Sequence, residues 1–275
     1  MVIDFHFHLA RRNELYRDIY QFCEKVWEKE GMSFLDIVNG DIDEYLKSQG
    51  VDYAVGLAEI SPITTGIIGN EEVIEICKQN KRLIPGGNIN PYMVRSIRDE
   101  VKRLHKMGMR VIKLYPTYQY FYPNESFLYP LYETAQELEI PIMFHTGSSI
   151  FKGARIKYGD PIFLDDVAVD FPELKILLVH GGRGFFYDRA FFLAKLHKNV
   201  YMEISGLPPQ NLLKYYPDLE KIADKIIFGS DFPSTGNVKK NIDMIKNLPL
   251  SAESKKKILG ENARKILKLN GGRKV

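Results

Sequence analysis

The chain begins with MVIDFHFH, residues 1–8, and the predictions of the fold and of the functional site both start from this stretch. Its apolar residues predict a buried strand that ends in a His-x-His pair. Because side chains alternate between the two faces of a strand, His6 and His8 are expected to point the same way. Two imidazoles on one face can hold one metal ion, although the pair alone also fits packed or solvated histidines.

Composition narrows the class of protein. The 275 residues are 45% hydrophobic, and a formal charge of +3 gives no reason to expect a nucleic-acid partner. No apolar run approaches the ~20 residues of a membrane span, and Asp4 and His6 interrupt any signal-peptide core. We therefore expect no membrane partner and a cytoplasmic location, with Cys23 and Cys77 as buried thiols.

Eight short apolar stretches alternate with helical patterns along the chain. The predicted strands cover residues 2–8, 51–58, 83–89, 110–115, 140–146, 175–180, 200–205 and 226–231. Near-continuous apolar strands are typical of a parallel sheet covered on both faces. Eight β-then-α units predict a (β/α)₈ TIM barrel that forms a single domain over residues 1–275, and a doubly wound open sheet is the rival.

Polar residues at the ends of the predicted strands favour the barrel. They are Glu59, Asn88, Asn90, Lys113, His145, His180, Glu203 and Asp231. A barrel gathers all eight carboxyl ends around one mouth, where barrel enzymes work, whereas an open sheet spreads them along a line. Four of the six histidines close a predicted strand, and together with Asp231 they indicate a metal site.

The ordered motifs resemble those of the amidohydrolase superfamily. After His-x-His come His145, the His180-Gly181-Gly182 turn and the GSDFP stretch at residues 229–233. GMRVIKLYP at 108–116 and LGENA at 259–263 are similar to the amidohydrolase-related branch that contains aminocarboxymuconate-semialdehyde decarboxylase.

The resemblance implies a site and a cofactor. His6, His8, His145 and Asp231 would surround one divalent metal, preferably Zn²⁺ with Mn²⁺ as an alternative. His180 would be the acid–base residue, and Asp231 could also accept a proton. Related decarboxylases suggest a homodimer. Three imidazoles and a carboxylate suit zinc independently of the resemblance.

Further residues are candidates for binding a carboxylate-bearing small molecule. Lys113 ends an apolar run and could bind an anionic group, or be carboxylated to bridge two metals as in binuclear relatives. Glu203 could pair with Lys113, either at the substrate or as a structural ion pair. Tyr115 begins an aromatic loop over residues 115–123, and Arg155 or Arg183 could clamp a carboxylate.

The sequence is compatible with three functions. The first is a metal-dependent hydrolase that directs a metal-bound water at an amide, ester, lactone or ring C–N bond. The second is a non-oxidative decarboxylase of an aromatic or unsaturated acid, in which His180 protonates the carbon that loses CO₂. The third is a barrel that binds a small molecule without turnover. The sequence analysis favours the hydrolase.

Overall fold

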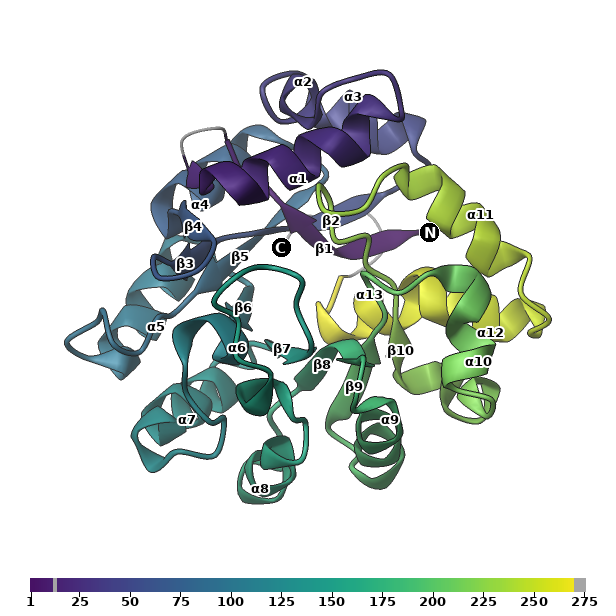
Figure 1. Cartoon of the computed structure of the whole chain (residues 1–275). Coiled ribbons are helices and arrows are strands. Elements are labelled where there is room, and N and C mark those ends of the chain that lie inside the picture. The colour runs from purple at the N-terminus through teal and green to yellow at the C-terminus, as the bar shows by residue number, and fades with distance from the viewer. Residues whose placement is uncertain (12–13, 270–275) are drawn as a thin grey trace.

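Eight parallel strands form the centre of the structure, a computed structural model that describes residues 1–11 and 14–269. They pair in chain order: β1 (Ile3–His8), β2 (Tyr53–Leu57), β5 (Leu83–Asn88), β6 (Val111–Leu114), β7 (Ile142–Gly147), β8 (Ile176–Arg183), β9 (Val200–Glu203) and β10 (Ile226–Ile227). Single hydrogen bonds close the ring between the last strand and the first. Phe5 N donates to Phe228 O at 3.0 Å, and Asp231 N donates to His6 O at 2.9 Å. The predicted (β/α)₈ barrel is confirmed (Figure 1).

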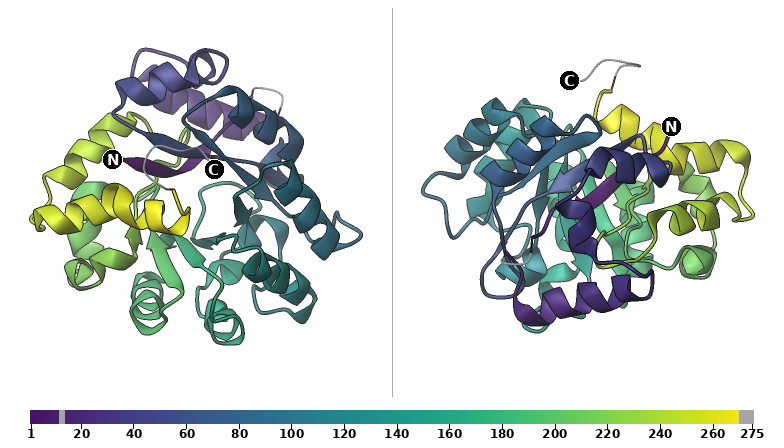
Figure 2. Two further views of the ribbon diagram at one scale, coloured as in Figure 1. Left: turned by 180° about the vertical axis from the view of Figure 1, so that it is seen from behind. Right: turned by 90° about the horizontal axis from the view of Figure 1, so that it is seen from above.

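Helices surround the strands in Figures 1 and 2. The longer ones are α1 (Arg17–Glu28), α3 (Ile42–Ser48), α4 (Asn70–Gln79), α5 (Ile97–Met107), α7 (Tyr129–Glu137), α8 (Phe163–Asp170), α9 (Tyr187–Leu196) and α11 (Val238–Lys246). Shorter ones are α2 (Phe34–Val38), α6 (Pro116–Gln119), α10 (Leu212–Tyr215), α12 (Ala252–Lys256) and α13 (Asn262–Ile266). None of the described helices combines the length and the apolar character needed to cross a bilayer.

The inside of the barrel is filled at one end and open at the other. Ile3 and Phe5 of β1 pack with Val111 and other inward side chains, and Ala263 and Ile266 of α13 pack against this inner cluster. Figure 2 shows the yellow C-terminal helices running across the end of the barrel that faces away from the viewer in Figure 1. The carboxyl ends of the strands are therefore left to form the functional face, as in other TIM barrels.

Two of the predicted strands differ from the structure by more than two residues at one end. The predicted strand 226–231 pairs only over β10, because the backbone then turns toward β1, where Ser230 N donates to the Asp4 carboxylate at 2.8 Å. β8 continues beyond His180 to Arg183.

Other segments also differ from the sequence prediction. Residues 59–68 form an unpredicted antiparallel hairpin of β3 (Glu59–Ser61) and β4 (Gly66–Ile68). Between β9 and β10 the chain forms three short helical segments, η4 (Pro209–Asn211), α10 and η5 (Leu219–Lys225), where the sequence predicts a helical pattern. The remaining short turns are η2 (Ser126–Leu128), η3 (Ile156–Gly159) and the π-helical η6 (Lys257–Glu261).

Candidate active site

A cavity of about 320 Å³ lies at the carboxyl ends of the barrel strands. Its lining includes every predicted site residue except Glu203 and Arg155: His6, His8, Lys113, Tyr115, His145, His180 and Asp231. Ile19, Phe22 and Cys23 of α1 form another wall, and Phe151 lies on the loop after β7. The barrel thus brings together residues from β1, β6, β7, β8 and the segment after β10.

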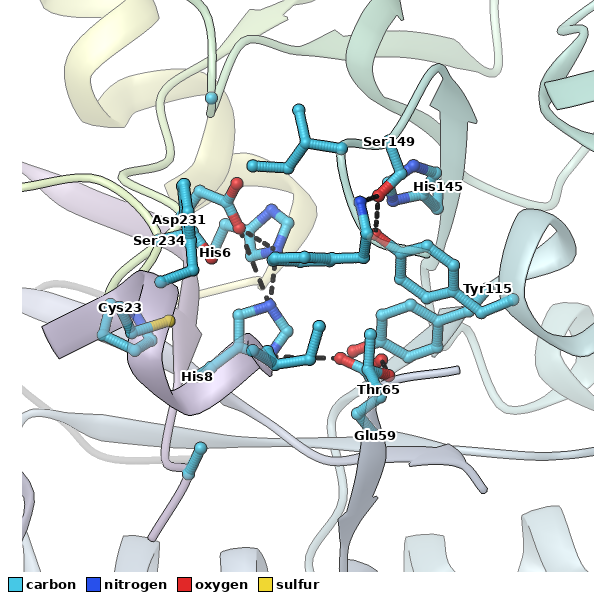
Figure 3. A pocket seen from close by; sticks show the side chains of 18 of the residues that line it. His6, His8, Cys23, Glu59, Thr65, Tyr115, His145, Ser149, Asp231 and Ser234 are labelled. Atoms are coloured by element: carbon cyan, nitrogen blue, oxygen red, sulfur yellow. Dashed lines mark hydrogen bonds and ion pairs between the residues drawn. The ribbon is translucent and has the colours of Figure 1, made fainter. Parts of the chain in front are cut away.

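His6, His8 and Asp231 converge most closely (Figure 3). The two Nε2 atoms are 3.0 Å apart, and Asp231 Oδ1 lies 3.3 Å from His6 Nε2 and 3.7 Å from His8 Nε2. Ligand atoms about 2.1 Å from a shared cation are separated by similar distances. The strand alternation expected for His6 and His8 is present, since their imidazoles face the same point.

Hydrogen bonds at Nδ1 fix how two of the imidazoles face the cavity. His6 Nδ1 lies 2.8 Å from Ser205 Oγ, and His180 Nδ1 lies 2.9 Å from the Ser205 carbonyl oxygen. A carbonyl can only accept, so His180 carries its proton on Nδ1 and keeps Nε2 as an acceptor. The Ser205 hydroxyl can accept from His6 in the same way, while it donates to Glu203 Oε2 at 2.8 Å. Such outer partners orient metal-ligating histidines.

His145 supplies the observation that tests whether these residues fit a metal. Its Nε2 is buried and has no hydrogen-bond partner among the described residues. The ring lies beside those of His180 and Tyr118, with centroids 4.7 Å and 4.9 Å away. A buried polar atom left unpaired is costly, and a cation would satisfy it. His145 is not among the three closely converging residues, His6, His8 and Asp231, but it lines the same cavity. The four side chains together form a donor set that fits one divalent ion.

Burial keeps the four imidazoles neutral, which is the form that binds metal. It lowers the pKa of His8 to about 3, and the charge of Lys113 adds to this effect. Burial, followed by Lys113, holds the pKa of His6 and His145 well below the usual value. Burial, followed by Arg183, does the same to the pKa of His180. Burial raises the pKa of Asp231 to about 6, against the opposing effect of Arg183 and Lys113.

A second convergence of ligating atoms involves His6, His180 and Glu203. Its centre is filled by Ser205 Oγ, which lies 2.8 Å from His6 Nδ1, 3.1 Å from His180 Nδ1 and 2.8 Å from Glu203 Oε2. A protein hydroxyl already satisfies these atoms. Of the two groups found among residues 1–11 and 14–269, His6, His8 and Asp231 are therefore the one whose centre no protein atom fills. This favours one metal over two.

Lys113 and Tyr115 lie next to this ligand set. The fully buried Lys113 ammonium is 3.3 Å from His6 Nε2 and 4.7 Å from the centre of the Tyr115 ring. Burial lowers the pKa of Lys113 to about 8, with Asp231 and Glu203 opposing the shift. The lysine therefore remains mostly cationic at neutral pH. Tyr115 donates its hydroxyl to Ala58 O at 2.9 Å and presents its ring to the cavity.

Glu203 and Arg155 lie away from the cavity lining. Glu203 is fully buried behind His6, and its Oε2 is 3.4 Å from His6 Nδ1, so its close partners are His6 and Ser205 instead of Lys113. Arg155 is exposed and stacks on the Tyr120 ring, 4.2 Å from its centre. Arg183 lines the cavity, and its guanidinium donates to Ser148 O at 3.0 Å.

The backbone at the two candidate catalytic residues is unusual. His180 and Asp231 both have φ of 63°, the left-handed region that few non-glycine residues adopt. The predicted glycine turn follows His180, with φ of 54° at Gly181 and 73° at Gly182. Such conformations persist where the surroundings enforce them, and they often mark functional sites. Here they turn both side chains into the cavity, His180 from within β8 and Asp231 from the segment after β10.

Several residues of the site were missed by the sequence analysis. Ser205 bridges His6 and His180, yet a serine at the end of a strand carries no signal for that role. Tyr118 was noticed only as part of an aromatic loop. Glu59 was noticed only as a strand-end residue, and its Oε2 lies 3.8 Å from His8 Nδ1. The cavity wall of α1 could have been found from the apolar helical spacing of Ile19 and Cys23.

Ser205→Ala is expected to weaken both metal binding and turnover. It removes the acceptor that holds His6 Nδ1 and leaves Glu203 without the hydroxyl donor. Loss of such an outer partner costs about 10–100-fold in metal affinity. Competition with a chelator measures this directly. Ser254→Ala, which removes a hydroxyl that bonds Glu220 far from the cavity, is the matched control. Unchanged metal affinity in Ser205→Ala would contradict the assignment.

The chain belongs to the amidohydrolase family, because the sequence profile described as Amidohydrolase matches residues 3–269. It is an enzyme of this superfamily. A gamma-resorcylate decarboxylase from Polaromonas sp. is 27% identical over an alignment covering 52% of this chain and 55% of that protein. The chain thus matches little more than half the length of this relative.

Solved structures share the fold. An uncharacterized TIM-barrel protein from Bordetella bronchiseptica has a TM-score of 0.79 at 22% identity, over 97% of this chain and 98% of that one. A 5-carboxyvanillate decarboxylase from Novosphingobium aromaticivorans, in complex with manganese and 4-hydroxy-3-methoxy-5-nitrobenzoic acid, has a TM-score of 0.67 at 17% identity, over 98% and 96%.

Proposed function

We propose that the protein is a metal-dependent carboxy-lyase that removes CO₂ from a small aromatic or unsaturated acid. The observation that carries the proposal is the shared cavity, in which neutral imidazoles and Asp231 adjoin the cations Lys113 and Arg183 between aromatic walls. The sequence analysis favoured a hydrolase. The activity named for the Polaromonas relative supports the decarboxylase alternative better. The third reading, binding without turnover, does not fit an enzyme of this superfamily.

His6, His8, His145 and Asp231 would hold one divalent ion, Zn²⁺ or Mn²⁺. When bound, that ion would supply a positive centre that attracts the oxygens of an anionic substrate. Lys113 and Arg183 would bind the remaining negative charge of the acid. The Tyr115 and Tyr118 rings would pack on a planar carbon skeleton and keep water from it.

His180 would move the proton that replaces CO₂. Its neutral Nε2 must first take up a proton, from a substrate hydroxyl or from solvent, and then deliver it to the carbon that carries the carboxylate. The new C–H bond is made with a pair of π electrons of the ring or alkene. The C–C bond then breaks, CO₂ leaves, and the electron pair of that bond restores the π system. The hydrogen bond from Nδ1 to Ser205 O holds the ring in place for both transfers.

Incubation with a panel of hydroxybenzoates, carboxyvanillates and aminomuconate-like acids tests the reaction class. We expect CO₂ release from at least one member, in the presence of added Zn²⁺ or Mn²⁺ and abolished by a chelator. Esters, lactones and cyclic amides form the parallel panel. Turnover of that panel without CO₂ from any acid would overturn the proposal in favour of hydrolysis.

Arg183→Met is expected to raise KM by about 10–100-fold and to change kcat less, because a charged hydrogen bond to the carboxylate is lost. Arg155→Met is the matched comparison, since Arg155 is exposed on Tyr120. Steady-state kinetics on the best acid of the panel measure both. A larger effect of Arg155→Met would instead support the sequence prediction that Arg155 clamps the substrate.

A further inference from the structure

The active-site cavity has a polar floor and an apolar roof. The floor consists of the candidate metal ligands with Lys113, His180 and Arg183, which lie at the carboxyl ends of the barrel strands. The roof consists of side chains from the segments that follow β1, β2 and β7: Leu15, Ile19, Phe22, Cys23, Ile68 and Phe151. A substrate whose charged group reaches the floor therefore places its other end against apolar side chains.

The helix α1 forms the largest part of the roof. Figure 2 (right) shows this helix, in purple, at the opposite end of the barrel from the yellow C-terminal helices. Leu15 lies just before the helix, and Ile19, Phe22 and Cys23 continue the i, i+4, i+7, i+8 spacing that occupies one helix face. Ile19 and Cys23 are buried, whereas the charged Lys25 of the same helix is exposed. The helix thus turns an uncharged face to the cavity.

Aromatic rings connect the floor with the roof. Tyr118 stacks on Tyr115, beside Lys113, with ring centroids 5.9 Å apart. Phe151 lies 6.5 Å from Tyr118, and Phe22 meets Phe151 edge-on at 5.7 Å, which joins α1 to the loop after β7. This continuous aromatic wall suits a flat ring that carries a charged group at one end and an apolar group at the other.

The cavity is larger than an unsubstituted ring needs. A cavity of about 150 Å³ is enough to bind benzene, whereas this one measures about 320 Å³. The difference leaves space for a carboxylate, a cation and a short side chain. Water fills such space poorly beside the roof, because an ordered water needs two to four polar partners and the roof side chains are apolar. An aliphatic group of the substrate is the better occupant.

We propose that the roof is a subsite for a short aliphatic substituent, so that the substrate is an aromatic or unsaturated acid with an alkyl group opposite its carboxylate. The inference rests on the proposed function, since it takes the carboxylate to be the group bound at the floor. Each methylene group buried against the roof contributes about fourfold to binding. The preference for the alkylated acid would therefore grow with chain length until the roof is filled.

A homologous series of acids tests the subsite. The probes are 2,6-dihydroxybenzoate and its 4-methyl, 4-ethyl and 4-propyl derivatives, assayed for CO₂ release with the metal-loaded protein. We expect kcat/KM to rise about fourfold with each added carbon atom. A flat or falling series, with CO₂ released from the unsubstituted acid, would overturn the subsite and leave the proposed reaction intact.

Binding without turnover separates the subsite from the reaction. The corresponding compounds with a nitro group in place of the carboxylate cannot lose CO₂, so calorimetry with the metal-loaded wild-type protein measures their affinity directly. We expect the same rise with chain length. Affinity that rises while no acid of the series releases CO₂ would support the subsite and overturn the lyase reaction. Absence of binding by every compound would overturn both.

Variants of the roof test whether α1 is responsible. Phe22→Asn should lower the ratio of kcat/KM for the 4-propyl acid to that for the unsubstituted acid at least about tenfold, because an amide replaces apolar surface beside the chain. Phe192→Asn is the matched control, since Phe192 on α9 is 60% exposed and is not part of the cavity lining. It should keep the wild-type ratio.

Cys23→Met provides an independent check, because it adds volume in the roof instead of removing apolar surface. It should lower the same ratio, and circular dichroism verifies that each variant is folded. A role of Phe22 or Cys23 in stability alone would change activity on all acids equally and leave the ratio as in wild type. An unchanged ratio in both variants would overturn the assignment of the subsite to α1.

Discussion

His180→Asn is expected to reduce kcat by about 10²–10⁴-fold and to leave the metal content unchanged. The proton transfer assigned to Nε2 has no substitute in an amide, and general acid–base groups contribute that much. Asparagine is the appropriate replacement for two reasons. It tolerates the left-handed backbone at position 180, where φ is 63°. Its amide can also donate to Ser205 O, as His180 Nδ1 does.

Metal analysis of the purified protein distinguishes this role from a ligand role. We expect wild type and His180→Asn to carry the same amount of metal per chain, with substrate binding retained. Loss of metal in His180→Asn would show that the division between ligands and acid–base residue is wrong. Full activity of His180→Asn would contradict the proposal that His180 transfers the proton.

His145→Ala is expected to weaken metal binding by more than about 100-fold and to abolish turnover with it. The Nε2 atom of His145 is buried in the cavity lining and lacks a hydrogen-bond partner among the described residues. The loss of a direct ligand exceeds the effect of an outer partner. Titration of the metal-free protein with Zn²⁺ or Mn²⁺, followed by competition with a chelator, gives the affinity.

His105→Ala is the control for this experiment. His105 lies on α5, where its Nδ1 is 3.3 Å from Met109 O, and it lines none of the active-site cavity. The control should bind metal as wild type does. If His145→Ala retained wild-type affinity, the ligand set would reduce to His6, His8 and Asp231, and His145 would be left as a wall of the cavity.

Local sequence patterns predicted much of the fold because the barrel strands are buried on both faces. Apolar runs interrupted by helical periods carry this information directly, and the strand-end positions of His6, His8, His145 and Asp231 then place them at one mouth. Gly108, which has φ of 121°, ends α5, a position where a glycine in the sequence is a typical helix stop. The β3–β4 hairpin was missed because three-residue strands leave almost no alternation to detect.

The finer structure of the site depends on contacts between distant segments, which one sequence does not encode locally. Ser205 lies near His6 and His180 only after β1, β8 and β9 are side by side. Arg183 and Arg155 both follow a barrel strand, so position along the chain could not tell them apart. The structure separates them, since Arg183 extends β8 into the cavity and Arg155 stacks on Tyr120 at the surface.

The candidate ligands lie on both sides of the seam where the barrel closes. His6 and His8 belong to the first strand and Asp231 follows the last. Hydrogen bonds such as Asp231 N to His6 O and the stacked rings of Phe7 and Phe232 join the two segments there. A bound ion would add a further link between the first strand and the segment that follows the last one. The complete set of four ligands would therefore form only after residue 231 had been synthesised and the barrel had closed.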